Sequence, residues 1–157
     1  MKVYLDSTNS TRSVDELLDI TGLETKNLLH HATQTPLHVV LAFIVRPNAN
    51  PAGRELRKQC GNLDLERARA FVRNTQEPFV GSRDHLYFSR NMEHVFECAL
   101  TLAGEEATGR TFKVRTDQLL RVIIEEQDPD TEKFFLAFGI DQWVVQKALK
   151  QQKVVED

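Results

Sequence analysis

Residues 104–111 read Gly-Glu-Glu-Ala-Thr-Gly-Arg-Thr and match the spacing of a phosphate-binding loop, in which two glycines precede a lysine and a hydroxyl residue. Arg110 replaces that lysine, and Glu105 and Glu106 lie where the phosphate would bind. The segment also follows a predicted helix, whereas a phosphate-binding loop follows a strand. We therefore interpret this stretch as a loop and expect no nucleotide site there.

Three histidines, His30, His31 and His38, lie close together in the first half of the chain, and Cys60 follows them. Adjacent histidines point in different directions on most backbones, and no C-x-x-C or H-E-x-x-H spacing accompanies them. We expect a polar loop and one histidine, His38, that packs within a helix. The sequence predicts no metal site.

His94 and Cys98 are four residues apart on one predicted helix, which brings their side chains within reach of each other. A thiol beside an imidazole is the arrangement of a nucleophile and its base. Cys98 borders the apolar stripe of that helix, however, and no third group is in view to orient the pair. No other residues combine a nucleophile, a base and oxyanion donors, so we expect a non-enzymatic protein without a cofactor.

The composition is that of an ordinary globular domain. The 157 residues carry a net charge of −3, with both signs interspersed, and 41% of them are hydrophobic. Such a chain presents no field that would attract nucleic acid or an anionic membrane, so we expect neither as a partner. The first residues lack the apolar core of a signal peptide, and two cysteines make no disulfide framework. We expect a cytoplasmic protein with reduced cysteines.

Four helices are predicted in the first half, from apolar residues at helical spacing and from the residues that flank them. Thr35 and Pro36 are a favoured N-cap and first helical residue. The helix that they open is apolar nearly all round, so it should lie at the centre of the fold. The predicted helices are about 14–22 with Ser13 as N-cap, 36–46, 52–60 ended by Gly61, and 63–72 with Asn62 as N-cap.

The stretch 74–88 breaks this periodicity with a proline, a glycine and scattered charges, and we interpret it as a linker. After it the same order of elements recurs. The predicted elements are a helix capped by Ser89, a loop at 104–115, a buried helix capped by Thr116, a turn at 128–130, a short helix ended by Gly139 and a last helix capped by Asp141.

The two halves align with each other. Residues 36–40 match residues 116–120, and the segment around Gly61 matches the segment around Gly139. Repetition of a unit that cannot bury its own apolar face indicates two units with one shared core. We predict one all-α domain over residues 1–157, an eight-helix tandem repeat of two four-helix units with pseudo-two-fold symmetry. The first repeat covers about 10–74, the linker 75–88 and the second repeat about 89–150.

This double repeat resembles the N-terminal domain of Clp-type AAA+ unfoldases. The segment from Thr35 to Ile44 is similar to the ClpA and ClpB form, whereas Thr116-Asp117-Gln118 and the later Phe138-Gly139-Ile140-Asp141 are more similar to the ClpC form. The resemblance covers roughly residues 10–150. It implies a rigid, non-catalytic module, tethered to an ATPase ring, that binds adaptor proteins or exposed apolar segments of substrates.

The resemblance also suggests a binding site. In ClpC-like members an acidic residue at the start of the buried helix of each repeat helps to hold phosphorylated arginine. The second repeat has Asp117 there, but the first has Leu37, so at most one weakened site is implied. A carboxylate in a first helical turn also interacts favourably with the helix dipole, and that explanation needs no ligand. Phe79 and Tyr87 lie in the polar linker, where they either fasten the linker or line a partner groove.

We therefore expect a docking domain that presents adaptor or substrate proteins to a Clp-type unfoldase, protease or disaggregase, with a Clp ATPase or protease as a further partner. Its expected protein-binding residues are Thr116, Asp117, Phe79 and Tyr87. Docking of this kind favours an exposed apolar groove rimmed by charge. The alternative is a stand-alone regulatory protein that keeps the same fold and serves a partner other than an ATPase.

Overall fold

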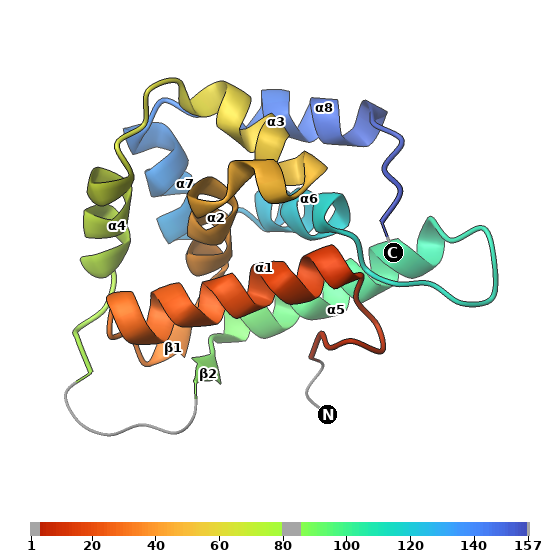
Figure 1. The fold of residues 1–157 in the computed structure, drawn as a ribbon, viewed down its shortest axis with the longest axis horizontal. Coiled ribbons are helices and arrows are strands. Elements are labelled where there is room, and N and C mark those ends of the chain that lie inside the picture. The colour runs from red at the N-terminus through yellow and green to blue at the C-terminus, as the bar shows by residue number, and fades with distance from the viewer. Residues whose placement is uncertain (1–3, 80–85, 157) are drawn as a thin grey trace.

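The computed structural model describes residues 4–79 and 86–156, which contain eight α-helices and two short strands (Figure 1). The all-α, eight-helix fold predicted from the sequence is confirmed. The elements in chain order are α1 (Arg12–Leu23), a π-helical segment η1 (Glu24–Leu28), β1 (Thr33–Gln34), α2 (Pro36–Val45), a 3-10 turn η2 (Pro47–Ala49), α3 (Pro51–Cys60), α4 (Leu65–Arg73), β2 (Tyr87–Phe88), α5 (Arg90–Glu105), α6 (Thr116–Glu126), α7 (Pro129–Ala137) and α8 (Gln142–Gln151).

Two helices form the interior, and the others enclose them (Figure 1). Every residue of α2 from Pro36 to Ile44 is buried, and this helix contacts α1, α3, α4, α5 and α7. Helix α6 is the equivalent element of the second half and contacts α3, α5 and α8. A helix that is apolar on all sides must be surrounded by other elements, which is why α2 lies at the centre, as predicted.

Several predicted helix ends are confirmed. Thr35, Ser89 and Asp141 are the N-caps of α2, α5 and α8. The chain leaves α3 at Gly61 with a φ of 56° and leaves α7 at Gly139 with a φ of 66°. Both values lie in the left-handed region, which glycine adopts without a steric penalty. These paired glycines end the corresponding short helices of the two repeats.

Two other N-caps differ from the prediction. Helix α1 is capped by Thr11 rather than Ser13, because Thr11 holds the extended backbone that a cap requires and its Oγ accepts the N–H three residues on. Helix α4 starts after Asp64 rather than Asn62. The Asp64 carboxylate accepts an N–H of the first turn at 2.9 Å.

Helix α6 also starts one residue earlier than predicted. Arg115 has the extended backbone of the N-cap, and its N–H donates to the side chain of Gln118 at 3.0 Å. Thr116 is therefore the first helical residue, not the cap, and its hydroxyl is free to bond elsewhere. The predicted turn at 128–130 is in fact the start of α7, where Asp128 is the N-cap and a proline occupies the first helical position.

The two halves are joined by two short parallel pairings that cross between them. Ser10, just before α1, pairs with Val114, just before α6. Thr33–Gln34, just before α2, pair with Tyr87–Phe88, just before α5. The two pairings also have equivalent hydrogen bonds. The backbone N–H of Thr11 donates to the carbonyl of Val114 at 2.9 Å, and that of Ser89 donates to the carbonyl of Gln34 at 3.0 Å. Exchanging the halves exchanges the two pairings, as pseudo-two-fold symmetry requires.

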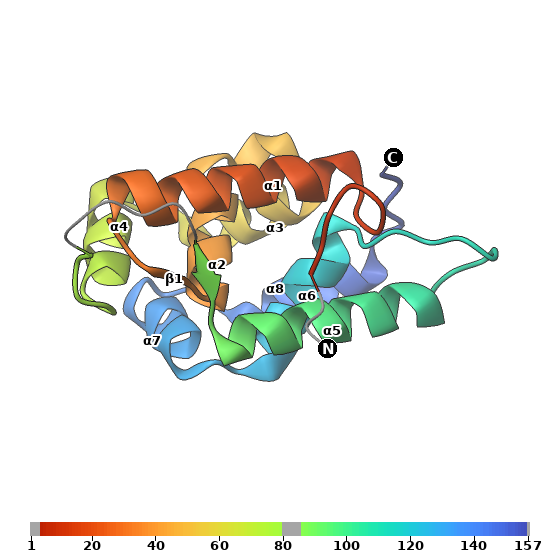
Figure 2. The same ribbon diagram turned by 90° about the horizontal axis from the view of Figure 1, so that it is seen from below.

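This arrangement sets the shape of the domain. Helices α1 and α5 run along opposite sides of the molecule, with β2 between them (Figure 2). Helices α4 and α7 lie at one end in Figure 1, and the loop after α5 and the last residues of the chain lie at the other. That loop begins at Glu106 rather than Gly104, because α5 extends through Glu105.

The predicted linker is partly described. Its central residues, 80–85 with Gly81, lie outside the described part of the chain. Before the gap, the backbone N–H of Phe79 donates to the backbone carbonyl of His30 at 2.7 Å. After it, the backbone N–H of Tyr87 donates to the backbone carbonyl of Ala32 at 3.2 Å. In the described residues no helix is long and apolar enough to cross a membrane.

Candidate functional site

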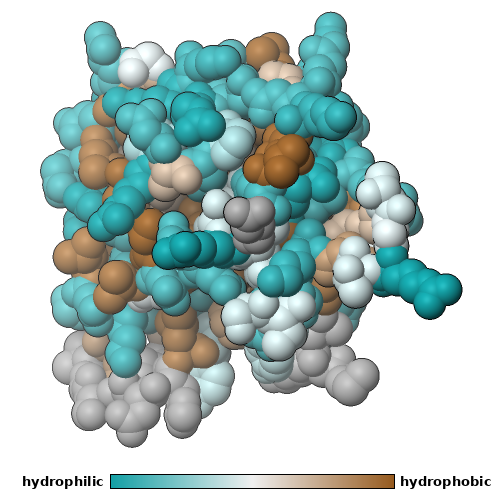
Figure 3. Space-filling model, turned by 45° about the vertical axis from the view of Figure 1, so that its right-hand side comes forward, coloured by the Kyte–Doolittle hydropathy of each residue, from teal (hydrophilic) through white to brown (hydrophobic). Residues whose placement is uncertain are grey.

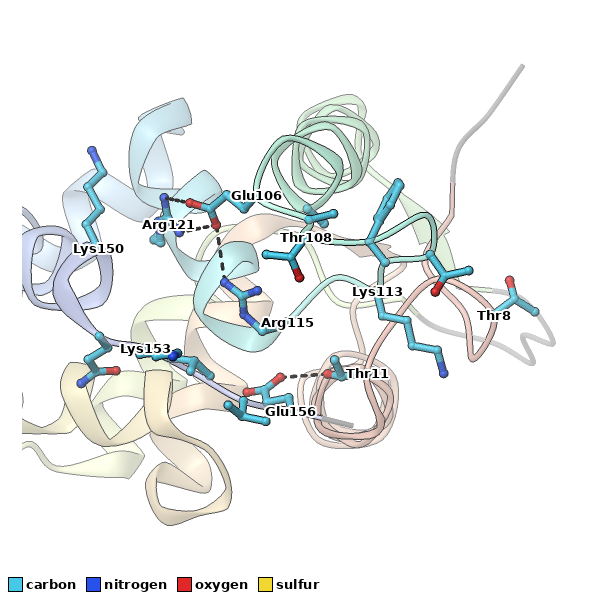
Figure 4. Close-up of a pocket in the computed structure, with 17 residues that line it drawn as sticks. Thr8, Thr11, Glu106, Thr108, Lys113, Arg115, Arg121, Lys150, Lys153 and Glu156 are labelled. Carbon is cyan, nitrogen blue, oxygen red and sulfur yellow. Dashed lines mark hydrogen bonds and ion pairs between the residues drawn. The ribbon is translucent and has the colours of Figure 1, made fainter.

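A groove with a volume of about 850 Å³ lies at the end of the molecule where the two repeats meet the last residues of the chain (Figure 4). Its walls come from the start of the chain at Thr8 and Thr11, from the loop between α5 and α6, from Arg115 and Arg121, and from residues 152–156. The groove thus collects residues that are far apart in the sequence, and the crossed pairing of Ser10 with Val114 holds two of these segments side by side.

The carboxylate of Glu156 occupies one side of this groove. It accepts a hydrogen bond from the Thr11 hydroxyl at 2.8 Å and from the Thr116 backbone N–H at 2.9 Å. The Thr116 hydroxyl donates to its second oxygen. A first-turn N–H of a helix has no partner inside the helix and favours a negative charge. Residues 152–156 are therefore anchored by a carboxylate at the N-terminus of α6.

Beneath the groove the carboxylate of Asp117 is buried and forms ion pairs with two arginines. Its side chain is 1% exposed and accepts the Nε and Nη2 donors of Arg115 at 2.9 and 3.3 Å. Arg121 forms a second ion pair with it at 3.7 Å. Burial alone would lower the pKa of Arg115, but the hydrogen bond and charge of Asp117 outweigh that effect and raise the pKa. Asp117 thus positions the basic wall of the groove.

Glu106 joins the loop after α5 to α6. Its two oxygens accept the Nη1 and Nη2 donors of Arg121 at 2.9 and 3.0 Å, and Gln118 donates to it at 3.1 Å. The hydrogen bond from Arg121 is the main reason that the pKa of Glu106 lies below its usual range. This contact fixes the loop at the edge of the groove (Figure 4).

The groove carries more positive than negative charge. Five basic side chains line it, against two carboxylates, Glu106 and Glu156. Two of the basic residues, Lys113 and Lys153, form no ion pair with any described residue. Figure 3 shows this side of the molecule, where hydrophilic residues predominate and apolar ones form small separate groups. The groove is therefore more polar than the apolar groove expected from the sequence.

The four residues predicted to bind a partner fall into two groups. Thr116 and Asp117 lie side by side at the start of α6, where Thr116 bonds Glu156 and Asp117 bonds Arg115. Both are buried. Phe79 and Tyr87 are 39% and 60% exposed, lie at the ends of the linker, and do not line the groove. A role for any of the four in binding a partner stays a prediction.

Sequence reasoning missed the groove residue Glu156. It lies in a polar stretch with no periodicity, 40 residues from Thr116, and nothing in the local pattern connects the two. The positive residues Lys113 and Lys153 were missed for the same reason. The one available signal was the resemblance to ClpC-like members, which pointed to Thr116 and Asp117 at the start of α6.

The structure also brings a third group to His94 and Cys98, which the sequence did not show. Glu126, the last residue of α6, approaches both. The three do not form a catalytic relay, because Cys98 and Glu126 both face the same imidazole nitrogen, Nε2. Burial and the neighbouring Glu126 raise the pKa of the Cys98 thiol to about 11, so a reactive thiolate is disfavoured.

The structure is therefore an all-α double repeat with a groove at the junction of the repeats. The same fold is found in solved N-terminal domains of Clp-type chaperones. The chain superposes on the Hsp104 N-terminal domain from Candida albicans with a TM-score of 0.69 and 14% identity, covering 91% of this chain and 90% of that one.

A plant protein gives the same result. The N-terminal domain of the caseinolytic protease associated chaperone ClpD from Arabidopsis thaliana matches with a TM-score of 0.69 and 14% identity, covering 90% of this chain and 92% of that one. No protein-family model and no curated protein matches the sequence. The chain therefore has the Clp N-terminal domain fold, which confirms the resemblance inferred from its repeats.

Proposed function

We propose that this protein is a non-catalytic docking domain that binds extended segments of adaptor or substrate proteins for a Clp-type ATP-dependent unfoldase. The shared fold with two chaperone N-terminal domains, each matched over about nine-tenths of its length, supports the general role. The groove at the junction of the repeats supports the particular mode of binding.

The observation that carries this proposal is the path of the chain's own last described residues. Residues 152–156 have no regular secondary structure and lie along the groove, with the carboxylate of Glu156 held by Thr11 and Thr116. The groove thus already accepts a polypeptide segment, and its polar donors are already satisfied by a carboxylate. A partner segment of the same character would find the same donors.

The charge of the groove selects the kind of segment. Lys113 and Lys150 line the groove outside the segment 152–156 and add positive charge to the groove that holds the three donors of the carboxylate site, so acidic segments are favoured over basic ones. Asp117 contributes indirectly, since its buried carboxylate holds Arg115 in place. We therefore infer an unfolded, acidic segment as the ligand, and not a folded basic surface.

The test uses fluorescein-labelled β-casein, an unfolded acidic protein, as the probe in a fluorescence-anisotropy titration. Reversing the charge of the groove with Lys113→Glu and Lys150→Glu together should weaken binding at least about tenfold, because two attractions become repulsions. The matched control is Lys133→Glu, which changes an exposed lysine on α7, far from the groove.

Circular dichroism of each variant confirms that the exposed substitutions leave the helices intact. Equal affinities for the double variant and the Lys133→Glu control would remove the groove from the proposal. Absence of any binding to casein by the unmodified domain would overturn docking of unfolded segments and favour the regulatory alternative.

A further inference from the structure

Three side chains with metal-binding atoms meet on the surface between α5 and α6, away from the groove. His94 and Cys98 come from successive turns of α5, and Glu126 comes from the last position of α6. Nε2 of His94 lies 3.0 Å from Oε2 of Glu126 and 3.5 Å from Sγ of Cys98. The remaining pair, Sγ of Cys98 and Oε1 of Glu126, is also 3.5 Å apart.

These separations match the edges of a tetrahedral metal site. Bonds to zinc measure about 2.0–2.1 Å from nitrogen or oxygen and about 2.3 Å from sulfur. At tetrahedral angles such bonds place nitrogen and oxygen about 3.3 Å apart, and place sulfur about 3.5 Å from each of them. The two contacts of Cys98 have this length, and the contact between His94 and Glu126 is only slightly shorter. The three side chains would therefore need to move very little to coordinate an ion.

The backbone also supports the geometry. His94 and Cys98 are four residues apart on a helix of 16 residues, which keeps both side chains on one face. Helix α6 packs against α5, so Glu126 is presented to that face by the tertiary structure. His94 and Glu126 are exposed, which leaves the site open to an ion from solution.

The nature of the three ligands indicates the kind of metal. A thiolate and an imidazole favour a borderline or soft divalent transition metal over magnesium or calcium, which prefer oxygen ligands only. The carboxylate charges of Glu126 and Glu97 act on Cys98 and make the surroundings negative, which favours a cation.

We propose that His94, Cys98 and Glu126 form a binding site for a divalent transition-metal ion of the zinc type. Three protein ligands leave the fourth tetrahedral position to a water molecule or to a side chain of a bound protein. On binding, the Cys98 thiol gives up its proton to solvent and coordinates as the thiolate. The ion would join the middle of α5 to the C-terminal end of α6.

The test is a titration of the untagged protein with Co²⁺, which reports a cysteine ligand through a sulfur-to-cobalt charge-transfer band in the near ultraviolet. We expect one equivalent to bind, with Zn²⁺ displacing the Co²⁺ and removing the band. Cys98→Ser should abolish the band. Cys60→Ser is the matched control, because the second thiol of the chain lies elsewhere and is buried, and the band should be unchanged.

Two further variants test the other ligands. His94→Ala and Glu126→Gln should each weaken Zn²⁺ binding by about tenfold or more in calorimetry. Zn²⁺ should also raise the melting temperature of the unmodified protein and of Cys60→Ser, but not of Cys98→Ser, because an ion that binds only the folded state stabilises it. Lack of a charge-transfer band, or a band that survives in Cys98→Ser, would overturn the proposal.

Discussion

The imidazoles of His31 and His38 are in contact inside the first repeat, with Nδ1 of His31 2.9 Å from Nε2 of His38. The groups at the two ends of this pair fix both tautomers. The Thr35 backbone N–H can only donate, and it donates to Nδ1 of His38 at 3.0 Å. The Arg73 carbonyl can only accept, and it lies 3.2 Å from Nε2 of His31. Each neutral histidine must therefore carry its proton on Nε2.

Protonation of either ring would break this chain of hydrogen bonds, since two N–H groups would then face each other. His38 is fully buried, and burial, followed by the charge of His31, lowers its pKa to about 3. Burial also lowers the pKa of His31. In the unfolded chain both have ordinary values near about 6.5. The stability that depends on the neutral pair is thus complete above that value.

We predict that the free energy of unfolding falls as the pH drops from about 6.5 toward 3, because the unfolded chain binds protons that the folded chain excludes. His38 alone contributes at most about 1.4 kcal/mol per pH unit. His38→Gln should make this dependence shallower, since glutamine can accept from Thr35 as Gln118 accepts from Arg115. Urea unfolding at pH 7 and pH 5 measures the difference, and an unchanged slope in the variant would contradict the assignment.

Two glycines inside helices should respond in opposite directions to alanine. At Gly22, in α1, a Cβ atom would meet nothing within 4 Å, so Gly22→Ala should stabilise the protein by about 0.5–1 kcal/mol through helix propensity. At Gly53, in α3, a Cβ atom would lie 2.8 Å from the backbone oxygen of Pro47. Gly53→Ala should destabilise the protein despite its better propensity. The melting temperatures of the two variants should change in opposite directions. A higher melting temperature in both would show that η2 can shift to accommodate the Cβ atom at position 53.

Release of the Glu156 carboxylate should make the groove more available. A segment tethered to its own site competes at an effective concentration of about millimolar, so Glu156→Ala should tighten casein binding by roughly threefold to tenfold. The Thr116 amide loses its acceptor and should exchange with deuterium faster. Glu132→Ala, on α7, is the control. If Glu156→Ala binds casein no better than this control, residues 152–156 do not compete for the groove.

The repeats and most helix ends could be predicted because their causes are local. Thr35-Pro36, Gly61 and Gly139 act through their own backbone preferences, and those preferences hold in any fold. The start of α6 could not be fixed in this way. Thr116 is a good cap residue in isolation, but its hydroxyl bonds Glu156, and Arg115 takes the cap position beside the extended pairing of Val114.

The site was less predictable because its contacts are distant in the sequence. His31 was expected in a polar loop, yet it is buried against His38, because η1 carries the chain back toward α2. Glu126 lies 28 residues from Cys98 in the sequence, and only the packing of α6 against α5 brings the two side chains together. In each case the identity of the residue was informative, and only the tertiary structure supplied its partner.

The crossed pairings have a consequence for how the domain could exist in parts. Each four-helix unit has two short extended segments, one before its first helix and one before its second. Each of these segments pairs with an extended segment of the other unit. In half of the chain expressed alone, both extended segments would lack their pairing partners. Two identical halves could pair their extended segments with each other. The architecture is therefore that of a symmetric homodimer whose subunits have been fused into a single polypeptide.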